Sequence, residues 1–437
     1  MTECNQLTFE FASCERRKVV ADFRGGEISQ EGGLLLLREV DRELNLLQRA
    51  ASILPDDRSP ERVTHSQADL LRQRVFALAQ GWEDLNDHES LREDQLLQTA
   101  VGKSRTLASA PTLCRMEQRA DRKSAMSFNK LLVATFIESF ETTPEEIVLD
   151  FDATDDPVHG HQEGKFFHGY YCFLPLYVFC ASQPLLAWLR PANIDGARGA
   201  WFALKWLVSE LREAWPEVKI IWRADSGFCR WRMLKWSDDN NVDYIVGLAK
   251  NSRLLKMAEP LREQAAVQFE TSREKQRLFT WMSYGAQSWD RDRLVIAKAE
   301  YAIKGDNPRF VVTSLRGDAA ALYDKVYCAR GDMENRIKEQ QLCLFADRTS
   351  CHRWWPNQLR LVLSTLAYVL IDTLRRRALK GTELARAQAT RIRLELLKIG
   401  AVVVRNTRRV KVHLSGSWPR RELFETVHRR LVPQRSG

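Results

Sequence analysis

Apolar residues recur at helical spacing through the first third of the chain. Ser66 and Asp69 form a capping-box-like helix start, and Gly81 is typical of a helix end. A later helix is predicted by four apolar residues at steps of four, namely Phe128, Leu132, Phe136 and Phe140. Residues 60–145 are therefore expected to be mainly helical.

The pattern changes at residue 147 to short β-prone runs. Strands are predicted at 147–152, 166–181, 184–189, 218–225 and 242–248. One helix is predicted from Asp195 with its apolar face ending at Leu211, and another at 230–237. The order β-β-β-α-β-α-β predicts a mixed α/β layer.

The rest of the chain alternates between the two patterns. Strands at 279–284, 293–303 and 309–315 predict a β-rich insertion over residues 250–318. Helices are expected at about 322–345, at 359–374 after Pro356, and at 384–398. Residues 401–414 read as a hairpin. The 359–374 segment is apolar almost all round, which predicts a buried helix.

Composition excludes several classes of protein. Of 437 residues, 28% are charged and 44% hydrophobic, which is typical of a globular chain with several structural units. The nine cysteines form no CxxC pair, which disfavours a disulfide scaffold and favours a reducing cytoplasm. The apolar stretch 173–189 is too short and too interrupted by proline to span a membrane, so no membrane association is expected.

Positive charge is concentrated at the end of the chain. Residues 351–437 hold 19 Lys and Arg against 5 Asp and Glu, a net charge of +14, so the other 350 residues carry −5 of the chain's +9. A basic region on a mildly acidic body suits a polyanion such as nucleic acid, although a solvated basic face gives the same count.

Two predicted strands end in acidic residues. Asp150 and Asp152 share one face of the first strand, and Asp225 ends a later strand. Buried carboxylates without partners are costly, so strand-end acids that face one crevice are expected where cations neutralise them. Their oxygen atoms suit Mg²⁺, with Mn²⁺ as a substitute, and such ions can promote phosphodiester chemistry.

A third acid is expected from a helix. Arg330, Glu334 and Lys338 follow one another at steps of four and so share one helical face. Taken by itself this pattern indicates intrahelical ion pairs. Together with the two strand acids it suggests that Glu334 completes the site.

At these residues the sequence resembles a known family. Asp152-Ala-Thr154, Arg223-Ala-Asp225-Ser-Gly and Tyr327-x-x-Arg330-x-x-x-Glu334 are similar to the three motifs of DDE transposases of insertion sequences, group one, with the Tyr-Arg-Glu-Lys signature. The resemblance covers nearly the whole chain. It implies an α/β RNase H-like mixed sheet flanked by helices, a β-rich insertion, and metal-dependent DNA cleavage and strand transfer.

The resemblance also implies residue roles. Asp152, Asp225 and Glu334 would be the catalytic metal ligands, and Tyr327 and Arg330 would contact DNA. The signature expects Lys seven residues after the Glu, where this chain has Gln341. Lys338, one turn after Glu334, is the candidate to supply that charge. Asp150 remains the main rival of Asp152 because it shares the same face.

Other segments carry weaker signals. Arg115, in the segment 108–117, either reads DNA from a helix-turn-helix or belongs to plain helical packing. Arg408 and Arg409 are predicted phosphate contacts, as are the earlier arginines 375, 393 and 405. Trp354 and Trp355 either stack on an unpaired base or pack in the core. A zinc site at His159, His161, His168 and Cys172 is only weakly supported.

These observations predict five regions. They are a helical DNA-binding region (1–145), a first part of the catalytic core (146–249), the insertion (250–318), the helix with the third acid (319–347) and a basic region (348–437). The expected partners are double-stranded DNA, as terminal inverted repeats and target, and a second copy on paired ends, in the nucleoid of the cytoplasm. Two alternatives stay open: a hydrolytic RNase H-like nuclease, and a catalytically degenerate DNA-binding repressor.

Overall fold

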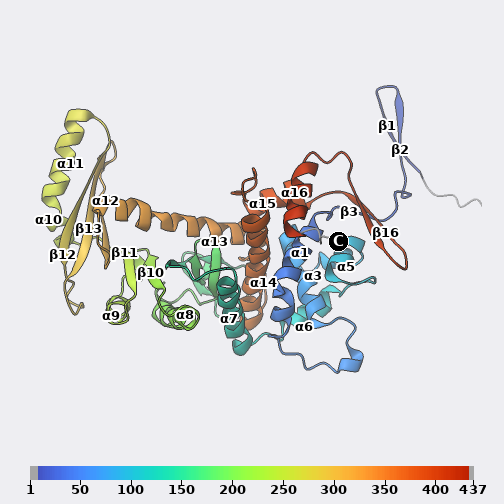
Figure 1. Ribbon diagram of the computed structural model, residues 1–437, viewed down its shortest axis with the longest axis horizontal. Helices are drawn as coiled ribbons and strands as arrows, with labels where there is room; N and C mark the ends of the chain where they lie inside the picture. Colours follow the sequence, from blue (N-terminus) through green and yellow to red (C-terminus); the bar gives the residue numbers. More distant parts are fainter. Residues whose placement is uncertain (1–7, 433–437) are drawn as a thin grey trace, which may run out of the picture. The chain divides into compact units, whose positions relative to one another are not determined.

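The computed structural model describes residues 8–432, which form two compact units (Figure 1). Unit 1 contains the described residues up to Asn45, Arg58–Arg115, and the described residues from Thr373 onward. Unit 2 contains Leu46–Asp57 and Met116–Asp372, and so holds every predicted acid.

Unit 2 is built around a mixed sheet of nine strands. Its order is β12-β13-β15-β11-β10-β4-β8-β9, with β14 paired to β13. Its strands are β4 Glu146–Ala153, β8 Leu176–Cys180, β9 Gln183–Trp188, β10 Lys219–Ala224, β11 Asp243–Leu248, β12 Gln276–Tyr284, β13 Arg293–Ala302, β14 Gly305–Asp306 and β15 Arg309–Thr313. Strands β4, β10 and β11 run parallel, and β8 and β9 complete an antiparallel meander from β4. This arrangement confirms the expected RNase H-like α/β fold.

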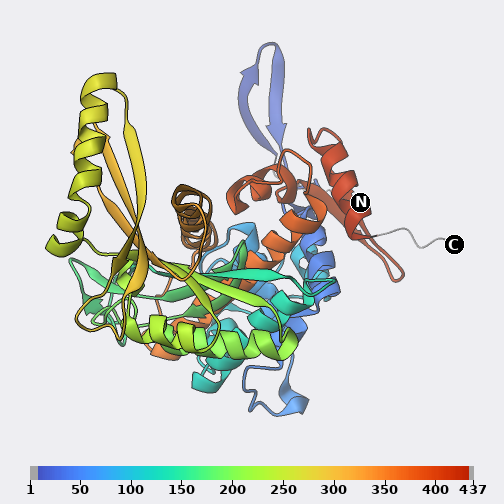
Figure 2. The same cartoon turned by 60° about the vertical axis from the view of Figure 1, so that its left-hand side comes forward.

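Both faces of this sheet are covered. Leu149 and Trp222 face a large core with α7 Arg122–Glu138, α8 Ala200–Ala214 and α9 Trp231–Asp239. On the opposite face of the sheet, Ile221 and Ile245 belong to a smaller core around Tyr323. The alternation follows from the two-residue period of a strand. Figure 2 shows α8 lying along one face of the sheet.

The insertion contains the predicted strands. They do not form a separate sheet, because β15 pairs with β11 and so continues the main sheet. It begins with two helices that the sequence did not predict, α10 Ser252–Met257 and α11 Glu259–Ser272. Ala265 is the single buried residue of α11, so the helix lacks the apolar repeat on which such a prediction depends.

The predicted strand 166–181 was wrong as one element. Turns divide it into β6 Phe166–Phe167, β7 Tyr171–Phe173 and β8, and the first two form a small sheet with β5 Asp156–Pro157. Gly169 has a φ of +79°, which favours glycine and allows the tight turn between β6 and β7.

The predicted helix 322–345 is present in sections: α12 Ala319–Ala321, the π-helix η3 Leu322–Tyr327, the 3₁₀ turn η4 Cys328–Arg330 and α13 Gly331–Leu344. The buried helix, α14 Trp354–Thr373, starts before Pro356. Proline is accepted there because N–H groups of a first helical turn have no intrahelical partner. Unit 2 also contains α2 Leu46–Ala51 and η2 Ser226–Phe228.

Unit 1 is largely helical. Its elements are α1 Leu34–Leu44, η1 Pro60–Arg62, α3 Gln67–Gln80, α4 His88–Leu91, α5 Gln95–Val101, most of α6 Ala110–Glu117, η5 Leu374–Ala378, α15 Ala389–Ile392, η6 Arg393–Leu397 and α16 Arg421–Leu431. The Ser66–Asp69 capping box is confirmed at the start of α3. The helix expected from residue 384 starts later, at Ala389, and the carbonyl oxygen of Ala387 before it accepts a hydrogen bond from Arg375 Nε at 3.0 Å.

Unit 1 also contains two hairpins. The predicted one is β16 Ala401–Arg405 with β17 Val410–Leu414. A third strand, β3 Ile28–Ser29, pairs with β16. The other, β1 Phe9–Cys14 with β2 Arg17–Ala21, was not predicted. Within residues 8–432, no helix has both the length and the apolar character needed to cross a bilayer.

Candidate active site

Asp152 and Asp225 lie at the edge of the unit 2 sheet that is formed by the carboxyl ends of strands β4 and β10. Strands β4 and β10 pair in parallel, with Asp150 opposite Arg223 and Phe151 opposite Ala224. The next position on each strand is Asp152 and Asp225, and neighbouring strands are about 4.8 Å apart. Asp225 Oδ1 accepts a hydrogen bond from Gly227 N at 2.8 Å, which orients this carboxylate at the start of η2.

Asp150, the rival candidate, is engaged elsewhere. It is 1% exposed and forms a two-point ion pair with Arg223, with Nη2 2.8 Å from Oδ2. Arg223 Nη1 also donates to the carbonyl oxygen of Val326 at 2.5 Å. This pair ties the sheet to η3, directly before Tyr327, so Asp150 acts as a structural support for the segment that carries the third acid.

Arg330 and Glu334 approach Asp152 from η4 and α13. Arg330 Nη1 is 3.5 Å from Asp152 Oδ1, and Arg330 Nη2 is 2.6 Å from Glu334 Oε1. The Asp152 side chain is largely buried, at 16% exposed, whereas that of Glu334 is 40% exposed. One guanidinium thus links the first and third predicted acids.

The charge balance at this edge is incomplete. Burial raises the pKa of Asp152 to about 7; Arg330 opposes the rise, and the carboxylates of Asp225 and Glu334 add to it. Burial disfavours the charged form of Arg330, but Asp152 and Glu334 outweigh this and raise its pKa. The three acids therefore share one electrostatic field, in which a single arginine does not fully compensate their charge.

Tyr327 lies over β11 beside Asp225. A methyl group on Gly247 would be 2.7 Å from Tyr327 Oη and 2.8 Å from Ser226 N, so this close approach requires glycine. Burial raises the pKa of Tyr327, with a further contribution from the Asp225 carboxylate. Gly247 was not singled out from the sequence, although a glycine inside a strand is a known sign of a close backbone approach.

The signature position Gln341 has a structural contact. Its Nε2 donates to the carbonyl oxygen of Asp155 at 3.2 Å, which fastens α13 to the loop after β4. Lys338 is exposed one turn after Glu334. The structure therefore leaves Lys338 open to a ligand and gives Gln341 a positioning contact.

In unit 1, Arg115 is exposed on α6, and Arg408 and Arg409 are exposed in the turn between β16 and β17. Other predicted phosphate contacts were wrong. Arg375 and Arg393 are 4% and 8% exposed and donate to the backbone carbonyls of Ala387 and Ala79, because they hold chain segments together.

The carboxylates of Asp152, Asp225 and Glu334 are suitable ligands for a divalent ion, but they are not close enough together to coordinate one in this structure. Among residues 8–432 no three His, Cys, Asp or Glu side chains are close enough to hold a metal ion, which also gives no support to zinc at His159 and His161. Carboxylate oxygens are the ligands preferred by Mg²⁺ and Mn²⁺. Burial is the main cause of the raised pKa of Asp152, and the carboxylates of Asp225 and Glu334 add to it, so a bound cation would favour the ionised form. The residues fit such an ion on condition that Arg330 moves from between Asp152 and Glu334.

Acids at the ends of two parallel strands of an RNase H-like sheet, with a helical acid after an insertion, are the arrangement expected of an enzyme that acts on nucleic acid. The family model of the transposase DDE domain group 1 matches residues 11–436, and the chain belongs to this family. It is therefore a transposase, an enzyme that cleaves and transfers DNA strands, and DDE transposases generally use divalent metal ions.

Comparison with other proteins adds two findings. No curated protein matches the sequence. Among solved structures, the chain is similar to the piggyBac transposase in its synaptic complex with hairpin DNA, with a TM-score of 0.43, 12% identity, and coverage of 84% of this chain and 80% of that one.

Proposed function

We propose that Asp152, Asp225 and Glu334 are the catalytic acids of this transposase and bind Mg²⁺, with Mn²⁺ as a substitute. The register of β4 and β10 carries this proposal, because it places Asp152 and Asp225 side by side at one sheet edge. The contact between Arg330 and both Asp152 and Glu334 supports the third assignment. Bound ions would activate the attacking oxygen and stabilise the leaving oxygen.

Arg330, Tyr327 and Lys338 are the proposed DNA contacts at this site. A guanidinium binds phosphate oxygens with two parallel hydrogen bonds, so Arg330 can exchange its carboxylate partners for a DNA phosphate. The Tyr327 hydroxyl lies beside Asp225 and can donate to a neighbouring phosphate. Lys338 is exposed on the turn after Glu334 and adds positive charge there.

The proposed reaction has two steps. Water attacks the phosphorus at an end of the insertion sequence, and the P–O3′ bond breaks to give a free 3′-hydroxyl. That hydroxyl then attacks a phosphorus in target DNA, which forms a new P–O3′ bond and releases a target 3′-hydroxyl. The same acids serve both steps, because each is an in-line displacement at a phosphodiester.

The proposed partners are the terminal inverted repeats, the target DNA and a second copy of the chain on paired ends. Exposed Arg408 and Arg409 in unit 1 would contact phosphates without reading sequence, and exposed Arg115 on α6 would contact DNA as part of a helix-turn-helix. Such a protein would act on the nucleoid in the cytoplasm.

A strand-transfer assay tests the proposal against its alternatives. DNA ending in a pre-cleaved 3′-hydroxyl is supplied with plasmid target and Mg²⁺, and joined product is expected. Cleavage without joined product would indicate the hydrolytic nuclease. Binding without either reaction would indicate the repressor. Omission of Mg²⁺ is the control, and activity that persists in EDTA would contradict the metal assignment.

A further inference from the structure

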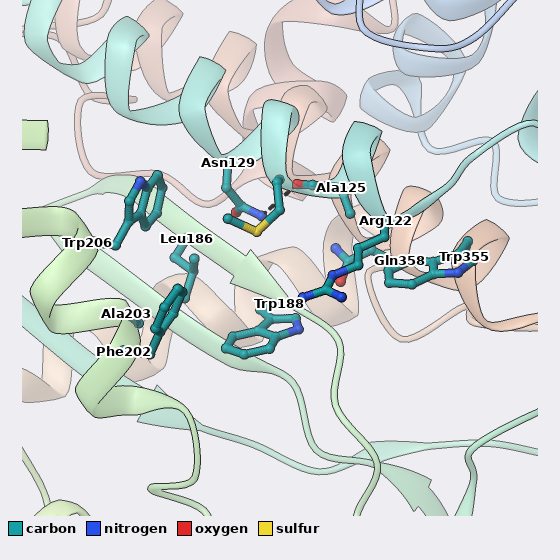
Figure 3. Close-up of a pocket in the computed structure, with 11 residues that line it drawn as sticks. Arg122, Ala125, Asn129, Leu186, Trp188, Phe202, Ala203, Trp206, Trp355 and Gln358 are labelled. Carbon is teal, nitrogen blue, oxygen red and sulfur yellow. Dashed lines mark hydrogen bonds between the residues drawn. The ribbon is translucent and has the colours of Figure 1, made fainter.

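A large aromatic cavity lies in unit 2, on the side of the sheet that α7 and α8 cover. It has a volume of about 430 Å³ and is open to solvent. Figure 3 shows the residues that line it. Its walls come from α7, α8, β9 and α14, and its aromatic lining residues are Trp188, Phe202, Trp206 and Trp355. A cavity of this size and composition is typical of a ligand site.

The charge of the cavity points to an anionic or neutral ligand. Arg122 is the one charged residue among its lining residues. It is exposed and forms no ion pair within the described part of the chain. Figure 3 shows its guanidinium directed toward Trp188. A flat aromatic ligand that carries a negative group therefore matches both the walls and Arg122.

The polar side chains of the lining are already occupied. Asn129 Oδ1 accepts from Ala187 N at 2.9 Å, and its Nδ2 donates to Ala125 O at 3.0 Å. Gln358 binds the backbone on both sides, with Oε1 2.7 Å from Leu189 N. The cavity thus offers surfaces for stacking and few directional hydrogen bonds. Such a site accepts an aromatic ring without selecting among the different bases.

The cavity lies at the same sheet edge as the acids. Ala153, directly after Asp152, pairs with Leu176, which pairs with Trp188. Trp188 is therefore two strands, or about 10 Å, from Ala153 along this edge. Because side chains alternate, Trp188 faces the α7 and α8 side, while Asp152 faces the α13 side.

We propose that this cavity binds one unpaired nucleotide of a DNA strand held at the catalytic edge. Its base stacks between Trp188 and Phe202, and its phosphate pairs with Arg122. The inference rests on the proposed DNA-cleaving function, but it assigns a separate site. It also explains why Phe202 is 60% exposed, since an aromatic ring left in water at the mouth of a cavity is a surface for stacking.

A fluorescent single strand tests the site. An oligothymidylate decamer with one central 2-aminopurine is titrated with the full chain in EDTA, and stacking quenches its fluorescence. Phe202→Ala is expected to weaken binding about 5- to 100-fold, the range for loss of one stacked base, while Phe202→Trp retains it. Arg122→Gln should reduce the slope of log affinity against log salt by about 0.7.

Matched controls use the adjacent residues. Trp201→Ala removes an exposed aromatic that does not line the cavity, and Lys123→Gln removes the next charge on α7. Both are expected to change affinity less than about 2-fold, in line with ordinary surface substitutions. Equal affinities for all variants would overturn the proposal, as would a larger loss for Trp201→Ala than for Phe202→Ala.

Two further outcomes separate this site from the proposed function. If Phe202→Ala alters the sedimentation mass but leaves the quenching unchanged, the cavity is a protein interface and the nucleotide proposal is wrong. If the unmodified protein quenches the probe but never cleaves DNA with Mg²⁺, the proposed function fails while the nucleotide site stands. Cleavage with no quenching by the unmodified protein would overturn the nucleotide site alone.

Discussion

The guanidinium of Arg330 lies 3.5 Å from Asp152 Oδ1, at the position where a cation is needed to balance the acids. It also contacts Glu334, so one side chain of the protein joins residues from the sheet and from α13. An ion that binds these carboxylates must therefore compete with Arg330. Under the proposed function, metal binding would therefore release Arg330 for a DNA phosphate.

Replacement of Arg330 should separate these two effects. Arg330→Gln is expected to increase Mn²⁺ affinity several-fold, because the competing positive charge is gone, and to lower DNA cleavage at least 10-fold. Isothermal titration with Mn²⁺ and a cleavage assay measure the two quantities. Exposed Lys325→Gln, on the preceding turn, is the control. Weaker Mn²⁺ binding in Arg330→Gln would contradict the competition.

Asp225→Asn is expected to abolish Mg²⁺-dependent cleavage and leave DNA binding within about 2-fold of the unmodified protein. The amide oxygen can still accept the hydrogen bond from Gly227, so the backbone at η2 is preserved. A gel-shift assay and a cleavage assay provide the comparison. The matched control is Asp239→Asn, an exposed acid on α9. Full activity of Asp225→Asn would refute its role as a metal ligand.

Stability measurements distinguish Asp150 from Asp152. Asp150→Asn leaves Arg223 buried without its partner, so the free energy of unfolding should fall by about 3–5 kcal/mol. Asp152→Asn should not destabilise unit 2 at pH 8, because burial raises the pKa of Asp152 to about 7 and the ionised form is the unfavourable one. Urea denaturation of both variants at pH 8 tests this contrast, and the opposite order would reverse the assignment.

His88 should make unit 1 less stable in acid. It is buried beside Gln73 with a Nδ1 to Nε2 distance of 3.1 Å, and burial lowers its pKa from 6.5 to about 3. Between these values the unfolded chain binds the proton and the folded chain does not. The stability contribution is therefore complete above pH 6.5 and falls by about 1.4 kcal/mol per pH unit below it.

Urea denaturation at pH 5, 6 and 7 measures this loss. His88→Gln removes the titrating group and should show a smaller loss of stability between pH 7 and pH 5 than the unmodified protein. Exposed His413→Gln is the control and should keep the full loss. Identical pH profiles for His88→Gln and the unmodified protein would contradict a neutral buried imidazole.

Arg408 and Arg409 provide a test of DNA contacts in unit 1. Their joint replacement by Ala should weaken DNA binding on every sequence and reduce the slope of log affinity against log salt by about 2. The turn itself should persist, because Asn406 Oδ1 accepts hydrogen bonds from the backbone N–H groups of both residues. Binding measured by fluorescence anisotropy from low to moderate salt gives the slope. An unchanged slope would exclude both residues from the DNA interface.

Several features could be predicted from local pattern. The strand directly before Asp225, the capped helix at Ser66 and the hairpin at 401–414 each depend on short-range periodicity or caps. Helix α11 could not be predicted in this way, because its one buried residue gives no apolar repeat. The β1–β2 hairpin is exposed along both strands and gives no repeat of buried positions either.

The sequence by itself determined the mixed α/β class, the order of the three acids, and the family motifs that contain them. Only the tertiary structure decided that Asp150 is neutralised by Arg223 while Asp152 faces Arg330. It also decided that Gly247 makes room for Tyr327 and that residues from four elements line the aromatic cavity. These relationships join residues distant in sequence, and their energies depend on burial and on the partner across the sheet, neither of which is encoded in local periodicity.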